Sequence, residues 1–187
     1  MAETIARGRP DERFDLAAWD ALGETEERLE LVEGVLELSP SPTPRHQRIL
    51  QNLVTAFADA LGDGWAVLGP VDVVLVGDPR PTVRAPDVVV LPESMVATAT
   101  RADASDVLAI AEVVSPGSRR TDRVAKLAEY ARAGIEHHVV VDPGPPLTVT
   151  EFRRPVDGAY ERVPHPGDGP VRLAFGPEID PVTLLRR

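Results

Sequence analysis

The run VLAIAEVV at residues 107–114 constrains the fold of this chain more than any other segment. Its small and branched apolar side chains are interrupted by one carboxylate, Glu112, and the chain then breaks at Ser115-Pro116-Gly117. An apolar run of this length between turn residues is typical of a β-strand covered on both faces. An isolated charge there costs roughly several kcal/mol. We therefore expect Glu112 to have a partner, which is either a cationic side chain or a metal.

The segments that follow predict how this strand is connected. The sequence RRTDRVAKLAEYARAG, residues 119–134, has helical spacing and ends at a glycine, as helices commonly do. HHVVVDPGP, residues 137–145, reads as another buried strand. A strand, a crossover helix and a further strand favour a mixed sheet with helices on its faces. The predicted fold class is therefore α/β.

The remaining segments add a helix, two hairpins and further strands. Apolar residues recur at helical spacing between Arg45 and Gly62, which predicts a helix. Turn residues at Glu33-Gly34 and Asp157-Gly158 predict hairpins near the two ends of the chain. We also expect a short helix at 15–22 and a loop or short helix at 92–106. The runs 65–76 and 85–92 should each form one strand of the central sheet.

Length and composition limit the classes of protein to which the chain can belong. The 187 residues suit a single domain, which we assign to residues 14–187 after a flexible N-terminus at residues 1–13. No apolar run approaches the roughly 20 residues needed to cross a bilayer, and the N-terminus carries no apolar signal core. We therefore expect a cytoplasmic protein with no membrane partner. The absence of cysteine excludes disulfides and thiolate zinc sites.

Charge is distributed unevenly along the chain. The formal net charge of −10 argues against strong nonspecific binding to a polyanion. Residues 115–132, however, carry five bases and two acids directly after Glu112. The bases that we expect to meet a nucleic-acid backbone are Arg119, Arg120 and Arg123. When these charges are taken alone, a solvated helix face is the favoured explanation.

Two predicted strands each carry one acid in an apolar run, Asp87 in APDVVVL and Glu112 in AIAEVV. If these strands are neighbours in the sheet, their carboxylates converge and offer the hard oxygen ligands that magnesium prefers. Such a pair suits metal-assisted hydrolysis. Asp72, in PVDVVLV, lies in a similar run, and the pattern alone hardly separates it from Asp87.

Other polar residues have both a functional and a structural interpretation. Lys126 lies to one side of the helix face that should rest on the sheet, where its long stem can reach the acids or pair with Asp122. His46 falls on an apolar helix face, which favours a core histidine over a phosphate or water contact. His137 and His138 point to opposite faces of a strand and are expected to be packing residues.

At these residues the sequence resembles the Uma family of endonucleases, part of the PD-(D/E)XK, or restriction-endonuclease-like, superfamily. The resemblance is carried by RAPDVVVL, by AEVVSPGSRRTDRVAKLAEYARAGIEHHVVVDP and by LELVEGVLELSPSPTPRHQRIL, and it extends from about Phe14 to the closing GPEIDPVTLL. It implies a restriction-endonuclease-like core with a mixed central β-sheet flanked by helices, with the N- and C-terminal hairpins added to it.

The resemblance also implies roles for individual residues. Asp87 and Glu112 would hold Mg²⁺, with Mn²⁺ as a substitute, and the carbonyl of Val113 would join them. Glu30 matches an acidic position that the family places near the same site. The superfamily lysine, expected two residues after the glutamate, is absent because Val114 stands there. Lys126 matches the family's usual substitute on the next helix.

The leading hypothesis is a magnesium-dependent endonuclease that hydrolyses DNA phosphodiester bonds. A noncatalytic module with the nuclease fold, binding nucleic acid or a protein partner, is the alternative, supported by the acidic balance and by Val114. A hydrolase of small phosphate esters is a third hypothesis. Related nucleases often act as dimers, but no apolar stripe in this sequence marks the interface of a homodimer.

Overall fold

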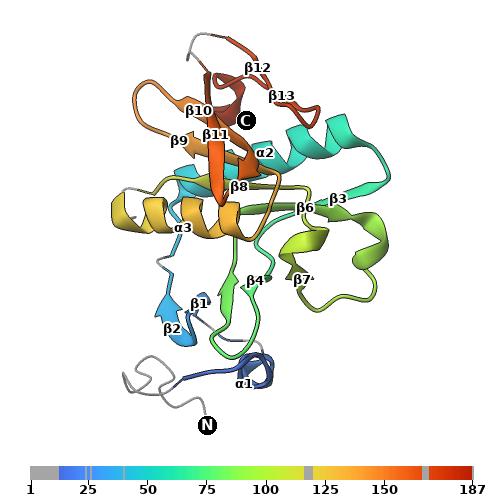
Figure 1. Cartoon of the computed structure of the whole chain (residues 1–187). Helices are drawn as coiled ribbons and strands as arrows, with labels where there is room; N and C mark the ends of the chain where they lie inside the picture. Colours follow the sequence, from blue (N-terminus) through green and yellow to red (C-terminus); the bar gives the residue numbers. More distant parts are fainter. Residues whose placement is uncertain are drawn as a thin grey trace.

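The chain forms two main β-sheets and passes between them several times (Figure 1). One of these passages, at residues 85–87, joins β5 (Thr82–Arg84) of one sheet to β6 (Val88–Pro92) of the other. The computed structural model describes residues 13–23, 25, 27–39, 41–115, 120–165 and 169–186. The side chains of residues 120–122 lie outside this description, as does almost all of the N-terminus that was predicted to be flexible.

The larger sheet has six strands in the order β11-β10-β9-β8-β6-β3. All neighbouring strands are antiparallel except β8 and β9, which are parallel. The helix α3 (Arg120–Arg132) makes the crossover between these two strands. The bounds of the six strands are β3 (Trp65–Leu68), β6 (Val88–Pro92), β8 (Ala109–Val113), β9 (His137–Asp142), β10 (Thr148–Val156) and β11 (Ala159–His165).

The smaller sheet has five strands in the order β2-β1-β5-β4-β7. Its strands are β1 (Leu29–Val32), β2 (Val35–Leu38), β4 (Val73–Val76), β5 (Thr82–Arg84) and β7 (Ala102–Asp103). The short helix α1 (Leu16–Leu22) packs on this sheet through Trp19, which contributes to an apolar cluster with Leu31 and Val83. Figure 1 shows this part of the molecule below the six-stranded sheet.

Two helices cover opposite faces of the six-stranded sheet. Helix α2 (Pro44–Leu61) buries Ile49, Leu53 and Phe57 in one core cluster, together with Val88 and Val90 of β6. Tyr130 of α3 belongs to a second cluster, formed with Val89 and Leu91 on the other side of the same strand. Because side chains alternate along a strand, this arrangement is what a strand covered on both faces requires.

Short elements complete the description. The pair β12 (Val171–Arg172) and β13 (Glu178–Ile179) forms a separate two-stranded sheet that the sequence did not predict. The described residues also include the short 3-10 helices η2 (Glu93–Met95), η3 (Ala104–Asp106) and η4 (Thr183–Leu185). None of the helices in the described parts of the chain combines the length and apolarity required to cross a lipid bilayer.

Most of the predicted elements are confirmed. Both hairpins form at the predicted turns, and Glu33 and Gly34 have φ of 48° and 79°, the left-handed values that a tight hairpin turn uses. The mixed sheet and its crossover helix are also confirmed. The prediction of one central strand over residues 65–76 is wrong. This run breaks at Gly69-Pro70, and its second half, β4, joins the other sheet.

Candidate active site

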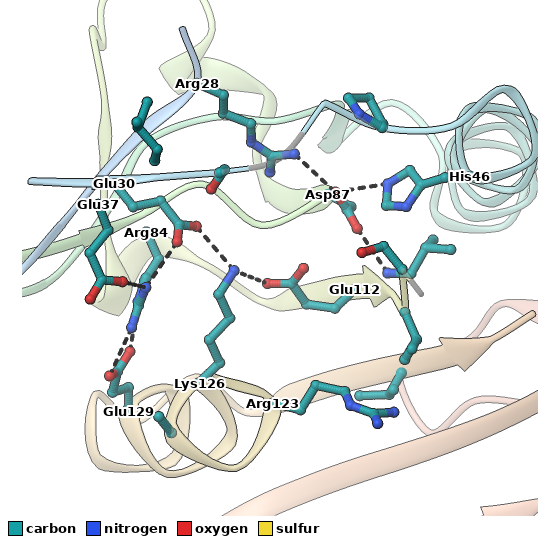
Figure 2. Close-up of a pocket in the computed structure, with 18 of the residues that line it drawn as sticks. Arg28, Glu30, Glu37, His46, Arg84, Asp87, Glu112, Arg123, Lys126 and Glu129 are labelled. Atoms are coloured by element: carbon teal, nitrogen blue, oxygen red, sulfur yellow. Dashed lines mark hydrogen bonds and ion pairs between the residues drawn. The ribbon is translucent and has the colours of Figure 1, made fainter. Parts of the chain in front are cut away.

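A cleft of about 740 Å³ lies where the two sheets and the two long helices meet. Figure 2 shows the acids and bases that line it, which come from β1, β2, β5, β8, α2, α3 and the segment 85–87 between the two sheets. Every strand or helix around the cleft therefore contributes at least one polar side chain to it.

The register of the sheets explains why these side chains meet. Val88 of β6 pairs with Ala111 of β8, so Asp87 and Glu112 occupy the next position along the two antiparallel strands. In the other sheet Leu31 pairs with Val83 and Glu30 with Glu37. The residues one step beyond Leu31 and Val83 are Glu30 and Arg84, so Glu37, Glu30 and Arg84 form one row across three strands.

Asp87 is buried and held from several sides. Its Oδ2 accepts a hydrogen bond from the backbone N–H of Val113 at 2.8 Å. Its Oδ1 lies 3.2 Å from Nε2 of His46 and 3.3 Å from Nη1 of Arg28. Burial raises the pKa of Asp87, but His46, the Val113 N–H and Arg28 outweigh burial, and the pKa is lower than usual. Asp87 is therefore an anion in a fixed orientation.

Glu112 faces a lysine and a tyrosine of α3. Its Oε1 accepts a hydrogen bond from the hydroxyl of Tyr130 at 2.8 Å and lies 3.4 Å from Nζ of Lys126. Burial raises the pKa of Glu112 to about 7, with Asp87 and Glu30 acting in the same direction against Lys126 and Tyr130. The partner expected from the sequence is thus a cationic side chain, and the neighbouring acids make a further cation favourable.

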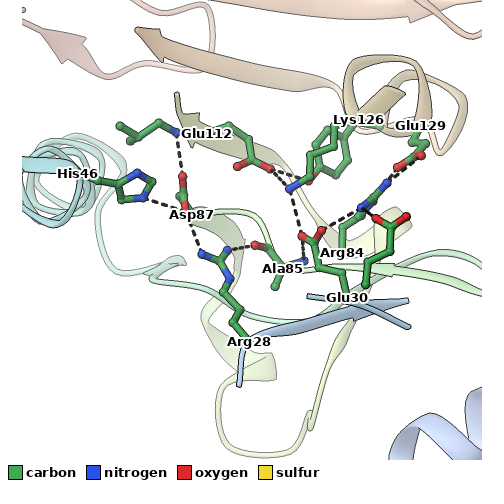
Figure 3. Close-up of polar contacts among 12 residues, drawn as sticks. Arg28, Glu30, His46, Arg84, Ala85, Asp87, Glu112, Lys126 and Glu129 are labelled. Atoms are coloured by element: carbon green, nitrogen blue, oxygen red, sulfur yellow. Dashed lines mark hydrogen bonds and ion pairs between the residues drawn. The ribbon is translucent and has the colours of Figure 1, made fainter. Parts of the chain in front are cut away.

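Lys126 lies between two carboxylates, as Figure 3 shows. Its Nζ is 3.1 Å from Oε1 of Glu30 and 3.4 Å from Oε1 of Glu112. Burial raises the pKa of Glu30, but Lys126 and Arg84 reverse this effect, and the pKa lies below its usual value. The ammonium group is thereby held beside Glu112 by an acid from the other sheet.

Arg84 is the most buried cation of the cleft and connects the smaller sheet to α3. Its Nε and Nη2 donate to the two oxygens of Glu129 at 2.7 and 3.0 Å, and its Nη1 donates to Glu30 at 2.9 Å. Nη1 also lies 3.4 Å from Glu37. A planar guanidinium can satisfy several carboxylates at once in this way. Arg84 therefore fixes both Glu30 and the helix that carries Lys126.

The donor chemistry of the cleft fits a magnesium ion. Asp87 and Glu112 offer hard carboxylate oxygens from neighbouring strands, and the Asp87–Val113 hydrogen bond brings the Val113 backbone to the same place. Within the described residues, no cluster of three or more histidine, aspartate or glutamate side chains has the geometry of a complete metal site. Two side-chain ligands suffice for magnesium, which usually keeps several waters.

The other predicted site residues are distributed as follows. Arg123 lines the cleft with an exposed side chain, 3.8 Å from Asp142. Arg119 and the side chain of Arg120 lie outside the described residues. Asp72 lies apart from this cleft, where it accepts a hydrogen bond from Trp19 Nε1 at 3.2 Å, so the structure separates it from Asp87.

His46, His137 and His138 are buried, as predicted for core and packing residues, and two of them also lie beside a carboxylate, His46 next to Asp87 and His137 next to Glu151. His137 contacts Phe175 and His138 contacts Tyr130, on opposite faces of the sheet as predicted. His46 is buried, as expected for a core histidine, but it also contacts Asp87. A buried carboxylate is a partner that satisfies a core histidine, so the interpretation favoured by the sequence is confirmed.

Sequence reasoning missed Arg28, Arg84 and Tyr130. Arg84 ends a β-branched segment three residues before Asp87, and a charge in such a run is the same signal that identified Glu112. Arg28 lies in an acidic segment and gives no signal. The ring of Tyr130 packs in the apolar cluster between α3 and the sheet, as helical spacing suggests, but its hydroxyl reaches Glu112.

Comparisons with known proteins agree with this fold. The sequence profile of the family described as "Uma2: Putative restriction endonuclease" matches residues 13–181. A crystal structure of "a putative nuclease belonging to DUF820" from Anabaena variabilis is similar, with a TM-score of 0.71 and 19% sequence identity over 92% of this chain and 99% of that chain. A comparison with curated proteins found no match. The fold is the predicted restriction-endonuclease-like α/β fold, and the chain belongs to the Uma2 family.

Proposed function

We propose that the protein is a magnesium-dependent endonuclease that hydrolyses phosphodiester bonds of DNA. The observation that carries this proposal is the position of Lys126, whose ammonium group lies beside Glu112 in the cleft that also contains Asp87. Two carboxylates and an ammonium on neighbouring elements are the groups that metal-assisted phosphodiester hydrolysis uses. Membership of the Uma2 family supports the same activity.

In this proposal Asp87 and Glu112 hold the metal, and the Val113 carbonyl completes the protein ligands. Bound magnesium would polarise the scissile phosphate and lower the pKa of a water molecule. The hydrogen bond from the Val113 N–H and the contact with His46 keep Asp87 oriented before the metal arrives. Tyr130 does the same for Glu112. These contacts reduce the reorganisation that metal binding requires.

Lys126 orients the attacking water and stabilises the negative charge that develops on the phosphate. The water oxygen bonds to phosphorus and releases a proton to solvent, while the bond from phosphorus to the leaving oxygen breaks and that oxygen takes up a proton from solvent. Glu30 supports Lys126 through the 3.1 Å contact. Arg123, exposed at the edge of the cleft, contacts the DNA backbone together with Arg119 and Arg120.

The contact of Lys126 with Glu112 also bears on the alternative of a noncatalytic module. That alternative was supported by the absence of a lysine at position 114. Because Lys126 brings its ammonium to the glutamate from α3, the cleft has the charge that Val114 does not supply. The contact therefore favours the catalytic proposal over the noncatalytic one.

Cleavage of a supercoiled plasmid tests the proposal. We expect nicking or linearisation with Mg²⁺ or Mn²⁺ and none with EDTA. Replacing Lys126 with methionine should reduce the rate by about 100-fold or more, as the loss of a group that stabilises transition-state charge does. Glu93, exposed on η2 outside the cleft, provides the control substitution Glu93→Gln. Cleavage in EDTA, or full activity of Lys126→Met, would refute the proposal.

A further inference from the structure

Arg28 lies at the mouth of the candidate active site, between Asp87 and solvent. The residue directly precedes β1, and its side chain reaches across the cleft to Asp87 Oδ1 at 3.3 Å and to the carbonyl oxygen of Ala85 (Figure 3). The Arg28 side chain is 27% exposed, whereas that of Asp87 is 3% exposed. The guanidinium therefore covers a proposed metal ligand from the solvent side.

Asp87 Oδ1 has two nitrogen neighbours that differ in mobility. His46 Nε2, at 3.2 Å, belongs to a buried ring on α2, next to the apolar side chains that fix this helix on the sheet. Arg28 has a long flexible stem and partial exposure. If a cation takes a place at Oδ1, Arg28 is the neighbour that can leave at low cost.

The Arg28 guanidinium is incompletely bonded where it lies. Its Nε is buried and has no hydrogen-bond partner among the residues that the structure describes. A buried donor without a partner costs free energy, typically about 1–3 kcal/mol. The planar donors of arginine match the oxygens of a phosphate, which can accept two parallel hydrogen bonds. A phosphate in the cleft would therefore satisfy donors that Asp87 and Ala85 leave unused.

We propose that Arg28 changes partner during the reaction cycle. It binds Asp87 while no metal is present, and it turns to a phosphate oxygen of the DNA when a divalent cation binds the carboxylate. The cation and the guanidinium compete for one oxygen and repel each other at this distance. Arg28 thus lowers metal affinity in the free protein and raises DNA affinity in the metal-bound protein. This inference rests on the proposed function.

Titration calorimetry with Mg²⁺ alone, without DNA, tests the claim that Arg28 lowers the metal affinity of the free protein. Arg28→Met should bind Mg²⁺ about three- to tenfold more tightly than the parent, since a competing positive charge is removed. Arg28→Lys keeps the charge and should stay within about twofold of the parent. Arg101 gives a matched control, because its side chain is also 27% exposed and pairs with an acid, Asp20, outside the cleft. Arg101→Met should leave the affinity unchanged.

Cleavage kinetics on a DNA duplex test the claim that Arg28 raises the DNA affinity of the metal-bound protein. At saturating Mg²⁺, Arg28→Met and Arg28→Lys should both raise KM by about tenfold, since neither side chain forms the paired hydrogen bonds of a guanidinium. If Arg28 only stabilised the fold, replacing it would lower metal affinity and thermal stability together. Unchanged or weaker Mg²⁺ binding by a folded Arg28→Met variant would overturn the inference, as would an unchanged KM.

These results are distinguishable from a failure of the proposed function itself. Asp87→Asn, measured in the same calorimeter, should abolish Mg²⁺ binding. If Asp87→Asn still binds Mg²⁺, the metal site is misplaced, whatever the result for Arg28→Met. If Asp87→Asn abolishes Mg²⁺ binding, and Arg28→Met behaves like the parent, then only the change of partner is wrong.

Discussion

Replacing Arg84 with methionine is expected to destabilise the fold by about 3–5 kcal/mol, the usual cost of removing one partner from a buried ion pair. The Arg84 side chain is 2% exposed, and its partner Glu30 is 4% exposed. Glu129, which receives two of the hydrogen bonds, is 17% exposed. Methionine keeps most of the apolar stem but ends short of the guanidinium, and it leaves these carboxylates without their cation. The loss is therefore mainly electrostatic.

Glu37 shows how strongly this loss depends on burial. It also lies next to Arg84, but it is 53% exposed, so Glu37→Gln should cost less than about 1 kcal/mol. Guanidinium chloride unfolding, followed by circular dichroism, measures both variants. For a chain of this length, 3–5 kcal/mol corresponds to a loss of roughly 6–20 °C in Tm. If Arg84→Met costs no more than Glu37→Gln, the network does not hold the two sheets and α3 together as we describe.

Three further substitutions test other parts of the structure. Burial lowers the pKa of His138 to about 3, below its usual value of 6.5. Between these pH values the unfolded chain binds a proton at His138 that the folded chain does not bind, so the free energy of unfolding falls as pH drops from 6.5 towards 3. His138→Phe should flatten this part of the stability–pH curve. An unchanged slope of that curve would contradict the burial of His138. Tyr130→Phe removes a hydrogen bond to a carboxylate and should lower the free energy of unfolding by about 1.5–3 kcal/mol, whereas a loss below 0.5 kcal/mol, roughly the effect of a neutral substitution, would speak against that bond. Gly34 has φ of 79°, and a Cβ there would lie 3.1 Å from the carbonyl oxygen of Phe14, so Gly34→Ala should lower the free energy of unfolding by about 1–3 kcal/mol. Gly64→Ala, with open space around it, is the control in thermal unfolding. Equal Tm values for the two variants would refute the strain at Gly34.

The parts of the fold that the sequence predicts are those decided by local patterns. The turn at Glu33-Gly34 requires left-handed backbone at both residues, and the spacing of Ile49, Leu53 and Phe57 requires a helix with one apolar face. Neither depends on distant residues. For the same reason the run 65–76 was misjudged, because a strand pattern does not specify which of two sheets the strand joins.

The candidate site was predictable where an acid stood in an apolar run and where a long side chain on the next helix could reach it. Asp72 and Asp87 look alike in sequence, and only the register of β6 against β8 places Asp87 beside Glu112. The reach of Lys126 to Glu112 was anticipated, but its contact with Glu30 depends on how β1 lies beside β5 in the smaller sheet. Arg28 could not be found, since its role depends on a contact across 59 positions of the chain.

Asp72 also provides the control for the measurement that bears most directly on the central claim. The single-turnover rate of plasmid cleavage in Mg²⁺ should be compared between Asp87→Asn and Asp72→Asn. We predict that Asp87→Asn loses at least about 100-fold, because the proposed metal ligand is removed. Asp72→Asn should stay within a few-fold of the parent, since Asp72 bonds Trp19 away from the cleft. Equal rates for the two variants, or a larger loss in Asp72→Asn, would contradict the assignment of this cleft as the active site.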